Sequence, residues 1–406
     1  MLEVTELVNV ALGRAAPEGV AARAPARYAA RVPAPPVVVW NVCRHCILRC
    51  PHCYAAATPT PSPYDLTTAE ARRLIETLAQ AGVRVLILSG GEPLLRQDLV
   101  ELAAHARAVG LRPILSTSGV LLDGRMAAAL AAAGISYVGI SLDGLAPFND
   151  AYRGMSGAFE RAARGLACAK AAGMCVGVRM TVTRLNATHV EPLVEWAVAR
   201  DVDRFYLSHL LYSGRGLKLA CDDLHPEESR VLLGYVFETA ERLVRDGASL
   251  RIVTGGNDSD GPYFLRWVWS RYGCSAAERV EAVLRRRGGN SAGERILAID
   301  HRGHVHPDQF FTTRVLGDVR LQPFAEILAH PLREALRNRE KLLEGRCGSC
   351  AYKSLCRGSH RERALARYGA LWAPDPACVM TEWEIGVPPE ECAVEAAEAE
   401  AREAVV

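Results

Sequence analysis

The sequence lacks an excess of charge of either sign, a long apolar run and a basic, apolar start. Its 48 basic and 46 acidic side chains give a formal net charge of +2, which is not the pattern of a protein that binds nucleic acid through phosphates. The longest uncharged run, 126–142, is too short and too rich in alanine to span a bilayer. The chain begins with Glu3 and Glu6 instead of basic residues followed by an apolar stretch. We therefore expect a soluble, cytoplasmic protein with no nucleic-acid or membrane partner.

Cysteine, in contrast, is abundant, with 13 residues. Secreted scaffolds that depend on disulfides are normally much shorter than 406 residues and carry a signal peptide. The cysteines of this chain are therefore expected to be metal ligands or reduced thiols.

Short β-branched runs alternate with amphipathic stretches rich in Ala and Leu between Val37 and Gly216. Strands separated by helices favour a parallel sheet with right-handed crossovers. The pattern predicts an α/β fold, a partial (β/α)6 barrel followed by a C-terminal domain, in which chemistry lies at the carboxyl ends of the barrel strands. The predicted strands are 37–41, 83–88, 112–116, 137–142, 177–183 and 204–210. The predicted helices between them are 67–81, 96–109, 124–133, 158–172 and 189–199.

The rest of the chain divides by composition. After Gly216 the alternation is expected to stop, and a long helix over 226–246 precedes a loop rich in Gly, Asn and Asp. From Ile296 the pattern indicates a hairpin whose turn is 300–303. The predicted units are an N-terminal extension with a Pro-rich linker (1–36), the partial barrel (37–216), a substrate-facing insert of helices and loops (217–295), the auxiliary domain (296–386) and an acidic tail (387–406).

Cys46, Cys50 and Cys53 stand at the spacing C-x3-C-x2-C directly after the first predicted strand. Three thiolates on one tight loop can hold three irons of a [4Fe–4S] cube and leave the fourth iron open. A structural zinc ion would need a fourth ligand, which His45 or His52 could supply. The position at a strand end favours the cluster. We interpret Cys43, which precedes this set, as a small buried side chain.

Cys46, Cys50 and Cys53, together with Tyr54, resemble the signature of the radical S-adenosylmethionine enzymes. A second similarity is Gly90-Gly91-Glu92-Pro93 at the end of the second strand, whose backbone and Glu would receive the cofactor's amino group. Further motifs follow the third and fourth strands, although Ser118 replaces the Asn of the usual turn. The resemblance implies an enzyme that cleaves S-adenosyl-L-methionine to a 5′-deoxyadenosyl radical. The implied cofactor-binding residues are Gly90, Gly91, Glu92, Pro93, Ser118, Ser141, Asp143 and Arg179.

A second set of cysteines, Cys347, Cys350, Cys356 and Cys378, lies near the C-terminus with the spacing C-x2-C-x5-C-x21-C. Zinc ribbons use two compact C-x2-C pairs, whereas this set has one. Its pattern is similar to the SPASM or twitch domains attached to radical S-adenosylmethionine enzymes. The resemblance implies a second, fully ligated [4Fe–4S] cluster, with zinc as the alternative.

Within that family, segments such as 205–216, 253–258, 288–291, 304–308 and 372–378 resemble the heme-biosynthesis enzymes that act on didecarboxysiroheme. One branch removes two propionates on the route to heme d1, and its sibling converts two acetates to methyl groups in the alternative heme pathway. We favour the heme d1 branch, and a peptide maturase is a further alternative. The implied partners are a tetrapyrrole substrate and an electron donor such as ferredoxin or flavodoxin.

Several side chains are candidates for contact with such a substrate. Arg215 and His209 are the candidate catalytic residues, because arginine would bind carboxylates and histidine would bind the substrate iron. His304 and His306 are further candidate iron ligands, and a structural role is the favoured alternative for each of these three histidines. The aromatic stretch 263–272 contains Tyr263, Trp267 and Trp269, which would either stack on a macrocycle or, as we favour, pack within a helix.

Overall fold

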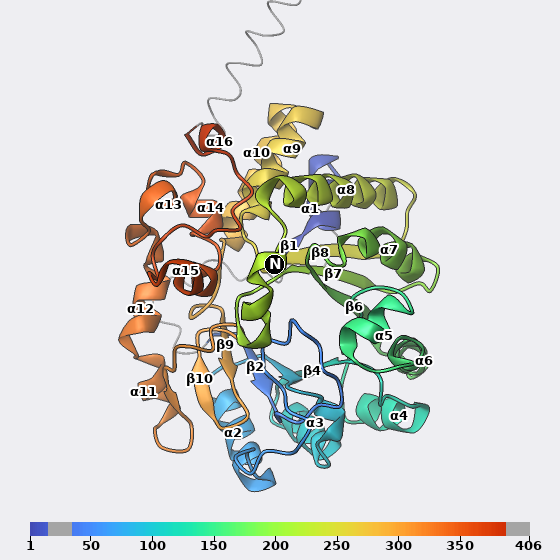
Figure 1. The fold of residues 1–406 in the computed structure, drawn as a ribbon. Helices are drawn as coiled ribbons and strands as arrows, with labels where there is room; N and C mark the ends of the chain where they lie inside the picture. The colour runs from blue at the N-terminus through green and yellow to red at the C-terminus, as the bar shows by residue number, and fades with distance from the viewer. Residues whose placement is uncertain (15–34, 387–406) are drawn as a thin grey trace, which may run out of the picture.

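The computed structural model describes residues 1–14 and 35–386, and the acidic tail and most of the Pro-rich linker lie outside these residues. Within them the strands form an 11-stranded sheet in the order β1-β8-β7-β6-β5-β4-β3-β2-β9-β10-β11. Strands β2 to β8 lie side by side in chain order and are all parallel to their neighbours. The sheet curls, and helices α2, α3, α4, α6 and α7 lie along its outer side (Figure 1). The partial (β/α) barrel with a C-terminal extension is confirmed.

All six predicted strands and the helices between them are present, with bounds shifted by a few residues. Val37–Val39 show the reason, since a run of β-branched residues forms a buried central strand. The strands are β2 (Val37–Asn41), β3 (Val85–Ser89), β4 (Arg112–Thr117), β5 (Tyr137–Ser141), β6 (Cys175–Val182) and β7 (Arg204–His209). The helices are α2 (Thr68–Gln80), α3 (Leu99–Ala108), α4 (Gly124–Ala132), α5 (Phe148–Arg153), α6 (Ala158–Ala171) and α7 (Val190–Val198).

Helix α2 begins with a capping box. The Thr67 side chain accepts a hydrogen bond from the Glu70 N–H, and the Glu70 carboxylate accepts one from the Thr67 N–H at 2.8 Å. This pair of bonds satisfies two donors at the helix start.

The strand–helix alternation continues past Gly216, where the sequence pattern predicted it to stop. Helix α8 (Pro226–Arg245) leads to a further parallel strand, β8 (Arg251–Gly255), which pairs with β7. Strand β8 is short and runs directly into Gly255 and Gly256, so its sequence resembles a loop. The predicted long helix is confirmed, but the start of the predicted loop is strand.

The N-terminal residues are part of the fold. Strand β1 (Leu2–Glu3) pairs antiparallel with β8, and helix α1 (Val4–Ala11) packs on α8 and α10. The Thr5 hydroxyl accepts a hydrogen bond from the Ile252 N–H at 2.7 Å. The segment predicted as an N-terminal extension therefore begins with a strand and a short helix, which cover one end of the sheet.

The C-terminal part adds a hairpin and a group of short helices beside β2 (Figure 1). The predicted turn joins β9 (Ile296–Ile299) to β10 (His304–His306), and β10 pairs with β11 (Gly317–Asp318). The remaining helices are α9 (Asp260–Tyr272), α10 (Cys274–Arg287), α11 (Phe324–Leu328), α12 (Pro331–Arg337), α13 (Gly345–Ser349), α14 (Lys353–Cys356), α15 (Arg361–Tyr368) and α16 (Glu382–Gly386).

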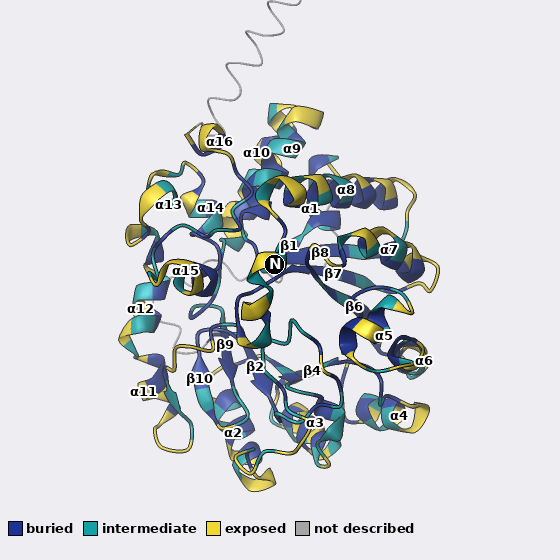
Figure 2. Cartoon of the chain, viewed as in Figure 1, coloured by how far each residue is buried: buried dark blue, intermediate teal, exposed yellow. Residues whose placement is uncertain are grey.

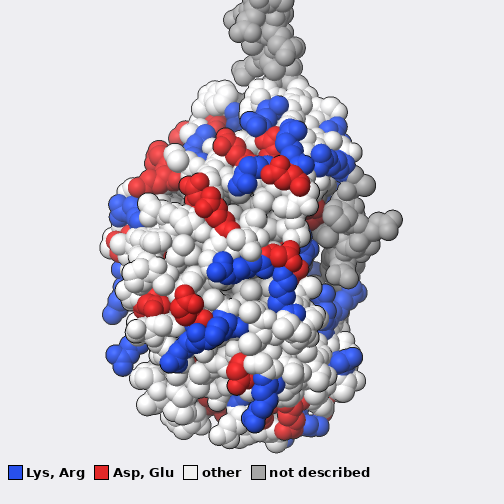
Figure 3. Space-filling view, turned by 90° about the vertical axis from the view of Figure 1, so that its right-hand side faces the viewer, with Lys and Arg blue, Asp and Glu red and all other residues white. Residues whose placement is uncertain are grey.

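The strands are buried, and the helices expose their outward faces (Figure 2). Basic and acidic side chains are interspersed over the surface seen in Figure 3, as the near-neutral net charge predicts. Over residues 1–14 and 35–386, none of the helices combines the length and the apolar character that crossing a bilayer demands.

Candidate functional site

Cys46, Cys50 and Cys53 lie on one loop, residues 42–58, which we call the cysteine loop. It follows the carboxyl end of β2, and its two ends are joined by a hydrogen bond of 2.9 Å from the Cys46 N–H to the Thr58 carbonyl. The pKa of Cys46 is raised to about 12, mainly by burial, and the neighbouring thiols of Cys50 and Cys53 contribute to this increase. Burial also raises the pKa of Cys50 to about 11.

The three thiols have the chemistry of ligands to a metal cluster. Cys46 and Cys50 are buried, and a bound metal would replace the protons of their thiols. Among the described residues, no three His, Cys, Asp or Glu side chains have the spacing that a single metal ion requires. Three thiols on one loop at the carboxyl end of a strand can hold three irons of a [4Fe–4S] cube. The donor set therefore fits an iron–sulfur cluster.

Gly90 and Gly91 pack directly against the cysteine loop. A Cβ atom at Gly90 would lie 2.5 Å from the Cys43 carbonyl oxygen, and one at Gly91 would lie 2.2 Å from that of His45. The Gly91 N–H donates to the Cys43 carbonyl at 2.8 Å. Both positions require glycine because the backbone of the loop approaches them, which is a different reason from the close approach of a ligand expected from the sequence.

The Glu92 carboxylate is fully buried and is occupied by donors of the chain itself. It accepts hydrogen bonds from the Thr117 hydroxyl at 2.5 Å, from the Ser118 N–H at 2.9 Å and from the Ser118 hydroxyl. It also accepts one from the Leu94 N–H, in the turn that contains Pro93. Glu92 thus joins the turn after β3 to the turn after β4, and Ser118 makes bonds that keep this carboxylate in place.

Asp143, at the end of β5, is also buried and holds side chains of the chain. Its Oδ2 lies 2.6 Å from Nη2 of Arg153 and 3.3 Å from Nε2 of His52. Its Oδ1 accepts a hydrogen bond from the Thr181 N–H at 3.1 Å. Ser141, two residues earlier, is partly exposed. Asp143 therefore connects β5 and β6 to the cysteine loop.

Arg179 on β6 and Tyr54 of the cysteine loop make one face of the sheet polar. Arg179 crosses β5 at Gly139, where a Cβ atom would lie 2.4 Å from Nε, and donates to the Ser116 hydroxyl at 2.8 Å. The Tyr54 hydroxyl donates to Asn41 at 3.0 Å. Burial raises the pKa of Tyr54 to about 12, although Arg179 lowers it. This polar face lies at the carboxyl ends of the strands, beside the cysteine loop.

Arg215 binds the backbone of the cysteine loop. Its guanidinium donates to the Cys50 carbonyl at 2.9 Å and to the Ala57 carbonyl at 2.6 Å. The neighbouring Gly214 has a φ of +57°, and a Cβ atom there would lie 2.2 Å from the Tyr54 carbonyl oxygen. The segment predicted to contact substrate thus fixes the shape of the cysteine loop.

His209, the other candidate catalytic residue, is a buried structural partner. Its Nε2 lies 3.1 Å from Oδ2 of Asp260. Burial lowers the pKa of His209, but Asp260 outweighs that effect and holds the pKa above its ordinary value. His304 and His306 similarly face Asp300 in the hairpin, at 3.3 Å and 3.6 Å. The structural alternative describes all three histidines.

Cys43 is buried at the end of β2. Its thiol donates to the Glu92 carbonyl at 3.4 Å, and burial raises its pKa to about 12. The interpretation of Cys43 as a buried side chain at a strand end matches this position.

The second cysteine group, Cys347, Cys350, Cys356 and Cys378, is brought together by α13, α14 and the segment before α16. Cys378, Cys347 and Cys350 all raise the pKa of Cys356, although burial is the main cause of that increase. Burial raises the pKa of Cys378 to about 12, and Cys347 contributes. The distant Cys378 therefore does lie with the other three thiols.

Segments from the middle of the chain hold this group in place. A Cβ atom at Gly289 would lie 2.2 Å from the Cys356 carbonyl oxygen, and the Asn290 N–H donates to that oxygen at 3.2 Å. Asn257 donates to the Ala377 carbonyl at 2.6 Å. The Gly- and Asn-rich segments that resembled the heme branch thus surround the second cysteine group.

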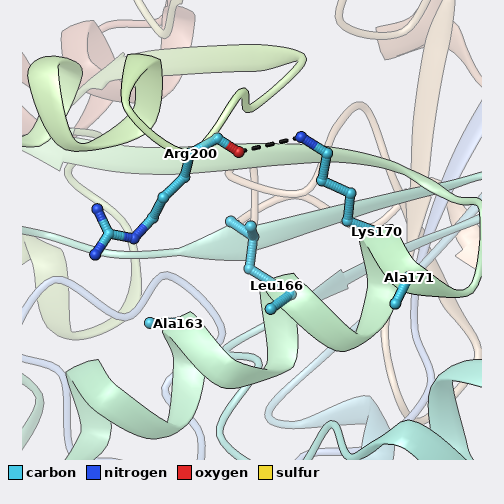
Figure 4. Close-up of a pocket in the computed structure, with 6 residues that line it drawn as sticks. Ala163, Leu166, Lys170, Ala171 and Arg200 are labelled. Carbon is cyan, nitrogen blue, oxygen red and sulfur yellow. Dashed lines mark hydrogen bonds between the residues drawn. The ribbon is translucent and has the colours of Figure 1, made fainter.

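The aromatic stretch of α9 packs against α8. The ring of Trp267 lies 5.6 Å from Phe237 and 5.5 Å from Phe264, and Tyr263 lies 5.8 Å from Phe237. The packing alternative predicted for Trp267 and Tyr263 therefore describes their environment. A hollow on the outer surface is lined mainly by α6, including Ala163 and Leu166, and by Arg200 (Figure 4). It contains no cysteine.

Sequence reasoning missed Arg153, whose Nη1 lies 3.9 Å from the Cys50 sulfur. It also missed the group formed by His360 and Asp308, 3.0 Å apart, with Phe310 between His360 and Tyr54. The sequence did contain a sign of the group around His360, because Asp308 lies in a segment that matched the heme branch. Arg153 had none, since it stands in an ordinary short helix.

Known proteins resemble this chain in sequence and in fold. The Radical SAM superfamily model matches residues 40–197. A pre-heme d1 synthase of Dinoroseobacter shibae is 41% identical over 368 residues, 89% of this chain and 90% of that protein. A Fe-coproporphyrin III synthase of Methanosarcina barkeri is 42% identical over 86% of this chain and 89% of its own length. Streptococcus suis SuiB bound to precursor peptide SuiA has a TM-score of 0.66 at 17% identity, covering 86% and 76% of the two chains, and shows a similar fold.

Proposed function

The chain belongs to the radical SAM superfamily, and we propose that it removes propionate side chains from didecarboxysiroheme on the route to heme d1. The observation that carries this proposal is the nearly full-length similarity to a pre-heme d1 synthase. Cys46, Cys50 and Cys53 would hold a [4Fe–4S] cluster. With S-adenosylmethionine bound, that cluster would supply a 5′-deoxyadenosyl radical that takes hydrogen from a substrate carbon.

The proposed cofactor contacts divide into two kinds. Glu92, Ser118 and Asp143 are buried and bonded within the chain, so they would shape the pocket around the cofactor. Ser141 and Arg179 are partly exposed, and their side chains would reach the cofactor directly. The backbone of Gly90, Gly91 and Pro93 would complete the set.

Arg215 and His209 would act as positioning residues. Arg215 would keep the cysteine loop in the form that binds the cluster, through its bonds to two carbonyls. His209 would hold the end of β7 against Asp260. Substrate binding would then fall to other groups on the polar face.

The second cysteine group would hold a second [4Fe–4S] cluster with four protein ligands. The grouping of all four thiols, and the fixed turn at Cys356, support this assignment. In this proposal the catalytic barrel extends beyond the predicted residues 37–216 to include α8 and β8, the rest of 217–295 faces the substrate, and residues 296–386 are the auxiliary domain. An electron donor such as ferredoxin or flavodoxin would reduce the enzyme.

The second candidate function is deacetylation of the same substrate to iron coproporphyrin. It is favoured by the similarity to a Fe-coproporphyrin III synthase, which matches this chain at nearly the same identity. Both candidates use the same site and the same cofactors. They differ in the product.

Anaerobically reconstituted protein with dithionite and S-adenosylmethionine should form 5′-deoxyadenosine, and Cys46→Ala should abolish this. Incubation with didecarboxysiroheme, followed by mass spectrometry, then separates the candidates. Loss of two propionate side chains supports the heme d1 reaction. Loss of two acetate side chains, with methyl groups left at those ring positions, supports deacetylation, and an unchanged substrate rejects both.

A further inference from the structure

The end of helix α5 is fixed against the cysteine loop. The Arg49 N–H donates to the Arg153 carbonyl at 2.9 Å. The helix ends at Gly154, which has a φ of +69°, and a Cβ atom there would lie 3.2 Å from the Cβ of Arg49. The side chain of Arg153 therefore starts from a backbone position that is set by the loop itself.

The Arg153 guanidinium joins a buried carboxylate to a cysteine sulfur. Arg153 is 4% exposed, and its Nη2 donates to Oδ2 of Asp143 at 2.6 Å. Its Nη1 is directed at the Cys50 sulfur, 3.9 Å away. Asp143 is itself held by the Thr181 N–H, so the position of the guanidinium is fixed from both sides.

The three sulfurs of the cysteine loop have different surroundings. The Cys46 sulfur accepts a hydrogen bond from the neutral Leu48 N–H at 3.4 Å. Arg215 also approaches Cys50, but it donates to the carbonyl oxygen. Among the hydrogen bonds described for these three sulfurs, that of Arg153 is the one donated by a charged group.

We propose that Arg153 is a positioning residue that sets the reduction potential of the cluster bound by the cysteine loop. This inference rests on the proposed function, which places a cluster on these three thiols. Reduction adds negative charge to a cluster, and a buried cation bonded to one of its sulfurs stabilises the reduced form. Hydrogen bonds from neighbouring residues to metal ligands are a general means of such tuning. Arg153 makes the cluster easier to reduce.

The test measures a potential. Wild-type protein and Arg153→Gln are reconstituted anaerobically, their iron is counted, and the midpoint potential is measured by a redox titration. The radical cluster is followed through the EPR signal that changes when S-adenosylmethionine is added. The potential of Arg153→Gln should be more negative than that of the wild type, whereas equal potentials at equal iron content would overturn the proposal.

Arg96→Gln is the matched control. Arg96 also pairs with an aspartate, Asp98, at 2.7 Å, and donates to the Val42 carbonyl at 2.8 Å near the cysteine loop. It makes no described bond to a cysteine sulfur, so its variant should keep the wild-type potential. A shift as large as that of Arg153→Gln would contradict a specific effect of the sulfur contact.

Arg153→Lys keeps the proposal testable if Arg153→Gln does not retain iron. A lysine keeps the charge but cannot form the fork of bonds that reaches both Asp143 and Cys50, so its potential should lie below that of the wild type. If Arg153→Lys has the reduction potential of the wild type, or if both variants lose iron, the proposal is overturned and Arg153 has a structural role instead. Wild-type protein without an EPR signal sensitive to S-adenosylmethionine would instead refute the proposed function.

Discussion

Arg363 and Asp375 form a bidentate ion pair, and neither side chain is more than 1% exposed. Nε and Nη2 of Arg363 each lie 2.8 Å from a carboxylate oxygen of Asp375. The remaining Nη1 donates to the Leu210 carbonyl at 2.9 Å, just beyond the end of β7. The pair therefore joins the C-terminal helices to the catalytic edge of the sheet.

Replacing Arg363 by Met should destabilise the protein by about 3–5 kcal/mol, because it leaves a buried carboxylate without its partner. Denaturant unfolding under anaerobic conditions measures this. The exposed pair of Arg72 and Glu101, at 2.9 Å, provides a control, and Arg72→Met should cost less than about 1 kcal/mol. A similar loss in the two variants would contradict the importance of burial.

Cys43→Ser should keep both iron content and 5′-deoxyadenosine formation, while Cys46→Ser should lose about four irons per chain, the content of one cube, and all 5′-deoxyadenosine formation. The two cysteines are three positions apart, but the Cys43 thiol is bonded to the Glu92 carbonyl, and a serine hydroxyl can donate to the same oxygen. Iron analysis and chromatographic detection of deoxyadenosine check the pair. Loss of iron in Cys43→Ser would make Cys43 a ligand.

Gly289→Ala should empty the second cysteine group, with a loss of about four irons per chain, the content of one cube. Its new methyl group would lie 2.2 Å from the Cys356 carbonyl oxygen, so the turn that carries this thiol must move. Gly234→Ala in α8 is the matched control, since no atom lies within 4 Å of its Cβ position. Equal iron in both variants would show that the turn tolerates the displacement.

Glu362→Gln should stabilise the protein at pH 8 and leave it unchanged at pH 4. Burial raises the pKa of Glu362 to about 7, against the lowering effects of Thr313 and His360. The folded state thus holds a proton that the unfolded state releases near pH 4.3, so stability falls as pH rises between these values. The gain at pH 8 should be about 3 kcal/mol.

Glu70→Gln should change the stability of the protein in the opposite direction to Glu362→Gln. Arg320 and the Thr67 N–H lower the pKa of Glu70 to about 2, so its charged form is stabilising above pH 4.3 and the stabilisation is lost as pH falls toward 2. Glu70→Gln should therefore be less stable than the wild type at pH 7. Thermal unfolding of both variants across pH 4 to 8 checks the two signs together.

The strands of the barrel could be predicted because their β-branched runs are long enough to be distinguished from their surroundings. Strand β8 could not, because the local sequence of Arg251–Gly255 passes into glycines, and its pairing with β7 and β1 determines its conformation. Propensity is a weak guide where tertiary contacts decide.

The cysteines could be found from spacing, but the partners of charged side chains could not. Arg215 has a guanidinium group, which can bind carboxylates. In the fold this group instead donates hydrogen bonds to the Cys50 and Ala57 carbonyls. Asp143 is similarly occupied by Arg153. A sequence shows which groups can form bonds, and only the fold shows which bonds are already satisfied within the chain.

Both outer strands of the sheet are two residues long, β1 at Leu2–Glu3 and β11 at Gly317–Asp318. Such short edges offer few free N–H and C=O groups to another chain, which protects an open sheet from edge-to-edge aggregation. At β8 this protection depends on the first residues of the protein, because Leu2 and Glu3 pair with Thr254 and Val253. Deletion of Leu2 and Glu3 would uncover β8 as a template for self-association.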